Sequence, residues 1–220
     1  MQRARQPHQK QERREAILAV ALSTLETTPF PAITMTQVAQ RAGLVKGTLY
    51  LYFATKEELF LEVFRDQLHR WFWDLEAGLE TLPRKGRLEA AARLITDTTV
   101  ARSSFRHLLA VLHGTLEHNL PEGTALIFQR EWLSRTTAMG ALLERALTFL
   151  VEGQGAGLLF QVYALTIGLQ AMAEPAAGVR KIQEGPDLAL LRLDFPQAFL
   201  GGLRTLMIGL RATNRSRSAS

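Results

Sequence analysis

Apolar side chains recur at intervals of three or four positions along almost the whole chain, which is the spacing that places them on one face of an α-helix. Ile17, Ala21 and Leu25 form such a stripe near the amino terminus. We find no alternating apolar and polar run followed by a hairpin turn, so the sequence predicts an all-α fold of about nine helices. The predicted helices cover residues 10–26, 34–43, 46–52, 55–82, 87–101, 104–120, 123–152, 155–173 and 194–211.

Several predicted helix ends carry capping residues. Thr34 followed three positions later by Gln37 is a capping-box pattern, and Gly43 is a good C-terminal glycine for the same short helix. Thr55 is the expected N-cap of the long helix over 55–82. The segment 174–193 is expected to be a long connection with at most one helical turn, and the Ser- and Arg-rich end, RATNRSRSAS, is expected to be frayed or disordered.

The amino-acid composition excludes several kinds of chemical site. The 220 residues include no Cys, which excludes disulfides, thiolate metal sites and cysteine nucleophiles and favours a reducing, cytoplasmic setting. No secretion signal is visible in the basic, polar start of the chain. The 21 uncharged residues between Glu152 and Glu174 are long enough for a bilayer. One stripe of that helix, however, carries two polar residues and a glycine, namely Gln154, Gln161 and Gly168. We therefore expect the helix to be buried in protein and to have no membrane partner.

The formal net charge of +5 is concentrated in the first quarter of the chain. Residues 1–56 carry eight basic and three acidic side chains, whereas residues 57–220 carry 18 of each. Such an excess fits either a nucleic-acid partner or a solvated basic face. Arg3 and Arg5 are candidates for phosphate or minor-groove contacts, although a disordered tail is the preferred interpretation of this arm.

Residues 34–52 have the layout of a helix-turn-helix, in which the second helix enters the major groove. Val38, Leu44, Leu49 and Phe53 are expected to form its small core, while Ala39 and Ala42 let the helices approach. The opposite face is left free, and its cation, hydroxyls and aliphatic side chains suit phosphates and base edges. This face carries Val45, Lys46, Gly47, Thr48, Tyr50 and Leu51.

The sequence of residues 33–60, ITMTQVAQRAGLVKGTLYLYFATKEELF, resembles the DNA-binding signature of the tetracycline-repressor (TetR) family of transcription regulators. The resemblance implies a homodimer that binds a palindromic operator and a carboxy-terminal domain that releases DNA when a small molecule fills its pocket. We therefore expect a DNA-binding domain over 1–56, with its recognition helix at 46–52, and an effector-binding and dimerisation domain over 57–220.

The resemblance also assigns DNA contacts to individual residues. Lys46 aligns with a phosphate or base contact, Gly47 with a close approach of the backbone, and Thr48 with a residue that touches bases or phosphate. Three other positions align with groups that bind phosphates: Tyr50, Tyr52 and Lys56, of which Tyr52 could instead pack beneath the helix. Thr36 would offer its hydroxyl and nearby amides to a phosphate.

Two positions depart from the family pattern. Val45 stands where the family often has Ser, so the recognition helix lacks a side-chain cap, at a cost of about 1 kcal/mol. Leu51 replaces a position that is frequently polar or aromatic, and an exposed Leu there could contact a thymine methyl group.

Residues 57–220 contain no catalytic constellation, so we expect no enzyme activity and no cofactor. His107, His113 and His118 are separated by six and five positions, which does not place them on one helix face for a metal. In a TetR-like fold this region surrounds the effector, and its apolar, aromatic composition favours a neutral or weakly polar, hydrophobic molecule. The candidate pocket residues are Trp71, Phe105, His113, Phe128, Gln129, Trp132 and Tyr163.

The helices at 155–173 and 194–211 are the candidate dimer interface. The first has no charge to present to solvent, and the second contains Gly201, Gly202 and Gly209, which lower helix propensity unless another backbone approaches. A four-helix bundle with the same helices of a second copy would bury both, as in the TetR family. Burial of both within one chain is the alternative.

Together these features predict a ligand-responsive transcriptional regulator, a repressor released from DNA by a hydrophobic effector. Two alternatives stay open within the same fold: an activator, and a regulator that responds to a protein. A helical enzyme with a basic amino-terminal tail is the alternative from a different class, and it lacks paired acids, a nucleophile with a base, or a metal cluster.

Overall fold

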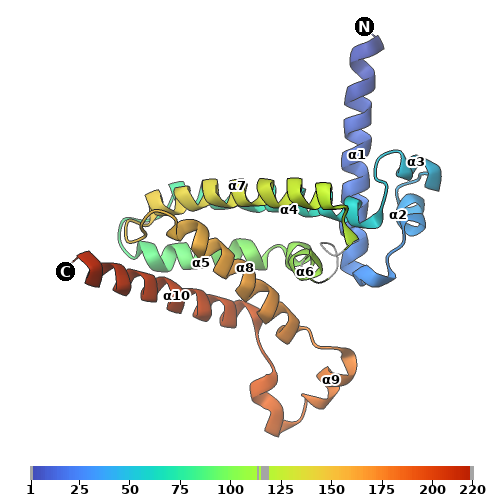
Figure 1. Ribbon diagram of the computed structural model, residues 1–220. Helices are drawn as coiled ribbons and strands as arrows, with labels where there is room; N and C mark the ends of the chain where they lie inside the picture. The colour runs from blue at the N-terminus through green and yellow to red at the C-terminus, as the bar shows by residue number, and fades with distance from the viewer. Residues whose placement is uncertain (1, 113, 115–118, 219–220) are drawn as a thin grey trace. The chain divides into compact units, whose positions relative to one another are not determined.

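The computed structural model describes residues 2–112, 114 and 119–218, and its regular elements are all helical (Figure 1). The all-α prediction is confirmed. The α-helices are α1 (Gln2–Thr27), α2 (Met35–Arg41), α3 (Lys46–Tyr50), α4 (Lys56–Glu80), α5 (Arg87–Val100), α6 (Ser103–Val111), α7 (Glu122–Ala146), α8 (Gln154–Ala173), α9 (Ala177–Ile182) and α10 (Phe195–Ser218). Two 3-10 helices are η1 (Phe30–Ala32) and η4 (Pro186–Leu191).

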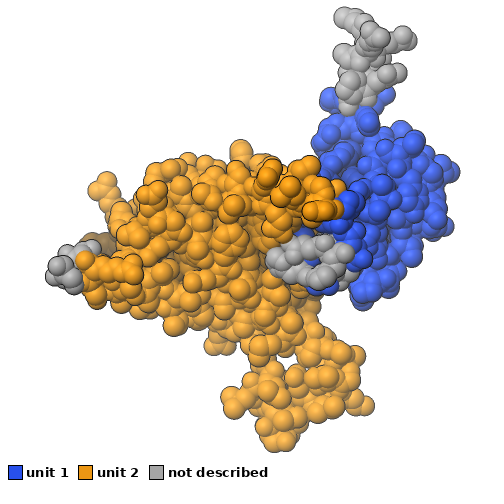
Figure 2. All heavy atoms as spheres, viewed as in Figure 1, with its two compact units in different colours: residues 1–68, 111–121 blue, residues 69–110, 122–220 orange. Residues whose placement is uncertain are grey.

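The chain divides into two compact units, coloured separately in Figure 2. Unit 1 contains residues 1–68 and 111–121, and unit 2 contains residues 69–110 and 122–220. Unit 1 therefore holds α1, α2, α3 and the first half of α4. The assignment of DNA binding to residues 1–56 and of effector binding to 57–220 stays a prediction.

The core of unit 1 comes from the apolar stripe of α1 and the residues that follow it. Ile17, Ala21 and Leu25 are buried, as their spacing predicts. Phe30 packs edge-on against Phe60, with ring centroids 5.2 Å apart. This contact anchors the beginning of α4 to the segment that precedes α2.

The core of unit 2 depends on a close crossing of α7 and α8. A Cβ atom at Gly140 would overlap with the backbone of Gly155 and Ala156, and one at Gly155 would overlap with the backbone of Gly140. Only glycine allows two helix backbones to approach so closely. The aromatic and aliphatic side chains on either side of this crossing are thereby brought into contact.

The last helix is longer than the sequence predicts, and the frayed end expected after residue 211 is wrong for the described residues. Helix α10 continues to Ser218. The buried Asn214 explains the extension, because its Nδ2 donates to the Phe149 carbonyl at 2.8 Å and contacts Gln154 Oε1 at 2.6 Å. Asn214, a polar residue in a hydrophilic segment, therefore anchors the end of α10 to the rest of the unit. The pattern of apolar positions does not indicate this contact.

The first helix also begins earlier than predicted. Helix α1 starts at Gln2 rather than near Lys10, so the amino-terminal arm is helical and not a disordered tail. Gln, Arg, Lys and Glu have high helix propensity, which supports a helix without an apolar stripe. The side chains of residues 1–7 lie outside the described part, so the DNA contacts of Arg3 and Arg5 stay predictions.

The predicted connection at 174–193 contains two short helices, α9 and η4, neither of which has a buried residue. Figure 1 shows this segment, in orange, extending away from α8 and α10.

Candidate nucleic-acid interface

The turn between α2 and α3 is fixed by local hydrogen bonds. The Thr34 hydroxyl accepts a bond from the Gln37 backbone N–H at 3.2 Å, which confirms the predicted cap at the start of α2. Gly43 has φ +66°, and the Leu44 N–H bonds back to the Ala39 carbonyl at 2.9 Å. This is a Schellman ending, which reverses the chain sharply and requires the left-handed conformation that glycine adopts without strain.

The helices pack on the small core that the sequence predicts. Val38, Leu49 and Phe53 are buried, and Leu44 is half-buried. Arg14 of α1 lies over the Phe53 ring, with its guanidinium carbon 5.3 Å from the ring centroid, and forms an ion pair with Glu62 of α4. The guanidinium therefore connects α1, the end of the helix-turn-helix and α4 within unit 1.

The other face of α3 is open to solvent. Val45 is 73% exposed and Leu51 80% exposed, large values for aliphatic side chains on a folded domain. The Lys46 ammonium lies 5.7 Å from the centroid of the Tyr50 ring, and Tyr50 is itself 42% exposed. The face thus offers a cation, an aromatic ring and two aliphatic groups within the seven residues 45–51.

The remaining predicted contacts of this surface differ in exposure. Thr36 and Gly47 are exposed, and a Cβ at Gly47 would have no neighbour within 4 Å, so an external backbone can approach there. Thr48 and Tyr52 are half-buried. Val45 is the N-cap of α3 and makes no side-chain capping bond, in agreement with the missing cap that the sequence indicates.

Lys56 is more engaged within the protein than the sequence suggests. Its ammonium donates to the Phe30 carbonyl at 3.1 Å and lies 4.2 Å from the centroid of the Phe30 ring. An ammonium has three donors, so this bond leaves capacity for a phosphate. The DNA contact of Lys56 stays a prediction, now with a structural role beside it.

In unit 2 the structure brings together most of the predicted pocket residues. Trp71, Phe105, Phe128, Trp132 and Tyr163 are all buried. Ring centroids are 5.4 Å apart for Trp71 and Phe105, 5.9 Å for Trp71 and Tyr163, and 5.4 Å for Trp132 and Tyr163. We call these five residues the aromatic cluster.

The two remaining predicted pocket residues are Gln129 and His113. Gln129 lies on the exposed side of α7, whereas its neighbour in sequence, Phe128, is buried. His113 lies outside the described residues.

Two polar groups at the aromatic cluster are hydrogen-bonded. The Tyr163 hydroxyl is 3.3 Å from the Thr136 hydroxyl, and the Trp71 indole N–H donates to the Thr98 hydroxyl at 3.2 Å. Burial raises the pKa of Tyr163 to about 12, against the lowering effect of its bond with Thr136. The phenol is therefore neutral at physiological pH and is a hydrogen-bonding group in an apolar environment.

A buried arginine on α6 was not singled out by the sequence. Arg106 donates to the Thr99 and Val100 carbonyls at the end of α5 and to Gln170 Oε1 of α8 at 2.8 Å. Its guanidinium carbon lies 4.6 Å from the centroid of the Phe195 ring, and burial lowers the pKa of Arg106. No sequence signal marks it, because its partners come from three other helices, two of which, α8 and α10, are far from it in the sequence.

His107 beside it contacts Glu174, with Nε2 and Oε2 2.7 Å apart. In the part of the chain that the structure describes, no three His, Asp or Glu side chains gather as a metal site would require. His113 and His118 lie outside that part.

Comparisons with known proteins cover both halves of the chain. Residues 17–63 match the family described as "Bacterial regulatory proteins, tetR family", and residues 65–214 match "Tetracyclin repressor-like, C-terminal domain". The HTH-type transcriptional regulator RutR of Escherichia coli (strain K12) is 33% identical over 82 residues, or 37% of this chain and 39% of that protein. The uncharacterized HTH-type transcriptional regulator YhgD of Bacillus subtilis (strain 168) is 42% identical over 134 residues, 61% of each chain.

The chain thus aligns with only about two fifths of the length of RutR. Among solved structures, a possible TetR family transcriptional regulator from Streptomyces coelicolor A3(2) superposes with a TM-score of 0.57 at 24% identity, covering 91% of this chain and 99% of that one. This likeness concerns the fold.

Proposed function

The chain belongs to the tetracycline-repressor (TetR) family of bacterial regulatory proteins, and we propose that it is a ligand-responsive repressor that binds a palindromic DNA operator as a homodimer. The observation that carries the proposal is the solvent-exposed face of α3, held by a buried core on its other side. The operator is double-stranded DNA, which places the protein in the cytoplasm. The proposal includes no catalytic step, cofactor or metal.

The exposed face of α3 has the groups that a major-groove helix needs. Lys46 supplies a cation for a phosphate or for a guanine edge, and Thr48 and Tyr50 supply hydroxyls. Thr36, at the start of α2, and Lys56, at the start of α4, supply polar groups for the phosphates on either side. The 80% exposure of Leu51 supports a contact with a thymine methyl group.

The exposed faces of α8 and α10 support the dimer. Only a third of the residues in the most apolar stretch of α8 are buried within the chain. The exposed side of the helix carries Gly157, Ala164 and Gly168 at helical spacing. In α10 a Cβ at Gly201 or Gly209 would meet no atom within 4 Å. Small residues on the exposed faces of both helices allow the same helices of a second copy to pack closely, as a four-helix bundle requires.

The aromatic cluster is the proposed site of effector recognition. Its buried rings and the neutral Tyr163 phenol offer apolar contacts and one hydrogen-bonding group, which fits a neutral, hydrophobic effector. Induction requires this molecule to bind the DNA-incompetent state more tightly than the DNA-bound state. A ligand with equal affinity for both states would not release the operator.

An electrophoretic mobility-shift titration with the DNA upstream of the protein's own gene tests the proposal. We expect a specific shift that weakens steeply with salt, because phosphate contacts release counterions. Lys46→Ala should weaken binding about tenfold and, if Lys46 binds a phosphate, lower the salt slope by about one. Lys181→Ala, an exposed charge change on α9, is the matched control and should bind as the unaltered protein does.

A shift that is independent of salt, or equal weakening in Lys46→Ala and Lys181→Ala, would contradict the proposed interface. Reporter expression distinguishes a repressor from an activator. Deletion of the gene for this protein should raise expression from the promoter that it binds in the mobility-shift assay if the protein is a repressor, and should lower that expression if it is an activator.

Leu51→Ala gives a sequence-specific test of the same face. Without the leucine side chain against a thymine methyl group, binding should weaken by about 1 kcal/mol or more, and only at operators that have thymine at one position. Binding to an operator series with each thymine replaced in turn by uracil, which lacks that methyl group, identifies the position. Uniform weakening across the series would contradict the proposed contact.

A further inference from the structure

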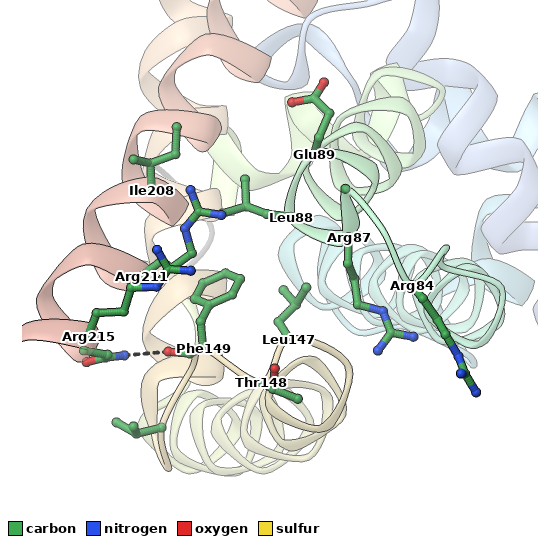
Figure 3. Close-up of a pocket in the computed structure, with 13 residues that line it drawn as sticks. Arg84, Arg87, Leu88, Glu89, Leu147, Thr148, Phe149, Ile208, Arg211 and Arg215 are labelled. Atoms are coloured by element: carbon green, nitrogen blue, oxygen red, sulfur yellow. Dashed lines mark hydrogen bonds between the residues drawn. The ribbon is translucent and has the colours of Figure 1, made fainter. Parts of the chain in front are cut away.

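A cleft of about 920 Å³ opens in unit 2 between the start of α5, the connection from α7 to α8 and the last turns of α10 (Figure 3). Its size is in the range of small-molecule sites. No member of the aromatic cluster lines it, so it is a different place from the proposed effector site. Its lining combines positive charge with apolar surface.

Four arginines lie in this cleft. Arg84 comes from the connection that precedes α5 and Arg87 from the first residue of α5, while Arg211 and Arg215 are four residues apart on one face of α10. Figure 3 shows Arg87 and Arg211 on opposite sides, with Leu147 and Phe149 between them. Two walls of the cleft therefore carry guanidinium groups.

These charges are not neutralised within the described residues, where none of the four forms an ion pair with a carboxylate. Glu89 is the acidic residue in the lining, and it is already paired with two other arginines, Arg204 and Arg93. The bonds from Arg204 hold the pKa of Glu89 below its ordinary value, so it stays ionised and engaged. The cleft keeps a net positive charge, whose repulsion an anionic ligand would relieve.

The backbone at the start of α5 adds to this field. Gly86 lines the cleft and is the N-cap of α5, with φ +68° and no side-chain capping bond. The first amides of this 14-residue helix consequently have no side-chain acceptor, and the helix dipole favours an anion at this end. Arg87 donates to the Ala146 carbonyl at 3.2 Å and to the Leu82 carbonyl at 3.4 Å, and its buried Nε has no partner.

Apolar side chains complete the lining and narrow the class of ligand. Leu88, Leu147, Phe149 and Ile208 lie beside the arginines. A bare inorganic ion would leave this surface in water, whereas an organic molecule with one anionic end would cover it. Arginine binds phosphate oxygens in pairs through its planar guanidinium group, so two arginines on one helix face suit a phosphate well.

We propose that this cleft is a second ligand site, which binds an organic phosphate carrying an apolar portion. Arg211 and Arg215 bind the phosphate from α10, Arg87 and the first turn of α5 face it from the other wall, and Leu147, Phe149 and Ile208 cover the apolar portion. The site requires neither DNA nor occupancy of the aromatic cluster.

Isothermal titration calorimetry of the full-length protein with octyl phosphate tests the proposal. We expect saturable binding with one site per chain, weaker binding of inorganic phosphate and weaker binding of octanol. Arg211→Gln and Arg215→Gln should each lower the affinity for octyl phosphate about tenfold. Arg217→Gln is the matched control, since it removes the same charge from the same helix at a residue outside the lining.

Circular dichroism and thermal melting of each variant check that the fold is retained. No saturable binding of octyl phosphate, or an equal drop in affinity for Arg211→Gln, Arg215→Gln and Arg217→Gln, would overturn the proposal. Because the assay contains no DNA, its outcome is independent of the mobility-shift result for the proposed repressor.

The phosphate could belong to a dissolved metabolite or to a lipid headgroup, and cosedimentation with phosphatidylglycerol vesicles separates the two sources. Vesicle binding that falls in Arg211→Gln but not in Arg217→Gln assigns a lipid headgroup to the cleft. Absence of vesicle binding, together with saturable binding of octyl phosphate, assigns a dissolved organic phosphate.

Discussion

Replacing Gly155 by alanine tests whether the crossing of α7 and α8 holds unit 2 together. The added Cβ would overlap with the backbone of Gly140, which no side-chain rotation can relieve, so the two helices must separate. Overpacking of this kind costs about 3 kcal/mol, and alanine returns about 1 kcal/mol through its higher helix propensity. We therefore expect a net destabilisation of about 2 kcal/mol, which lowers Tm by about 4–8 °C for a chain of this size.

The measurement is thermal unfolding followed by circular dichroism at a fixed protein concentration, because the proposed dimer would make Tm depend on concentration. Gly123→Ala is the control, since a Cβ at Gly123 in the first turn of α7 meets no atom within 4 Å. Its Tm should stay unchanged or rise. A Gly155→Ala protein as stable as the unaltered chain would refute the close backbone crossing.

Three further predictions concern stability. Thr34→Ala removes the α2 cap and should lower the free energy of unfolding by about 1 kcal/mol in urea titrations, while Thr36→Ala on the same helix should not. Tyr163 has a folded pKa of about 12, above its unfolded value of about 10, so stability should fall as pH rises between them. Tyr163→Phe should lose less stability over that range, and equal losses would contradict the buried phenol. Glu89 has a lowered folded pKa because Arg204 bonds to it, so its stabilisation is present above the unfolded pKa of about 4.3 and lost as pH falls through the folded value. Glu89→Gln should therefore have a lower Tm at pH 7, and the difference should shrink as the pH falls below the unfolded pKa.

The helix-turn-helix could be predicted from the sequence because its determinants are local. The Thr34 cap, the Gly43 turn and the buried positions Val38, Leu49 and Phe53 all lie within twenty residues of one another. Each is a short-range signal with its own physical cause, and all agree on one structure.

For the sites of unit 2, the sequence predicts the types of residue involved but not the contacts between them. Trp71, Phe105, Trp132 and Tyr163 were recognisable as apolar and aromatic, but their mutual contacts depend on how four helices pack. Periodicity predicts which face of a helix is buried, but it does not predict which other helix covers that face. For this reason Gln129 is among the pocket residues predicted from the sequence, whereas the structure shows that it is exposed, one position from the buried ring of Phe128.

The arginine-lined cleft between α5 and α10 could not be predicted from the sequence, for a different reason. Residues 57–220 are electrically neutral as a whole, so a charge count shows no excess there. Arg84 and Arg87 are more than 120 positions from Arg211 and Arg215, and the latter pair lies where the sequence predicted a helix end and a frayed tail. The tertiary anchor at Asn214 connects this segment to Phe149 and Gln154.

Within α3 and its last turn, residues that hold the fold and residues that face outward alternate over a few positions. Leu49 and Phe53 are buried, whereas Val45 is 73% exposed and Leu51 80% exposed. Substitutions at such exposed positions change stability by less than about 0.5 kcal/mol. If the exposed face of α3 binds the operator as proposed, operator preference can diverge by point mutation without selection for folding opposing the change, and a library restricted to Val45 and Leu51 would sample new specificities from a scaffold that remains intact.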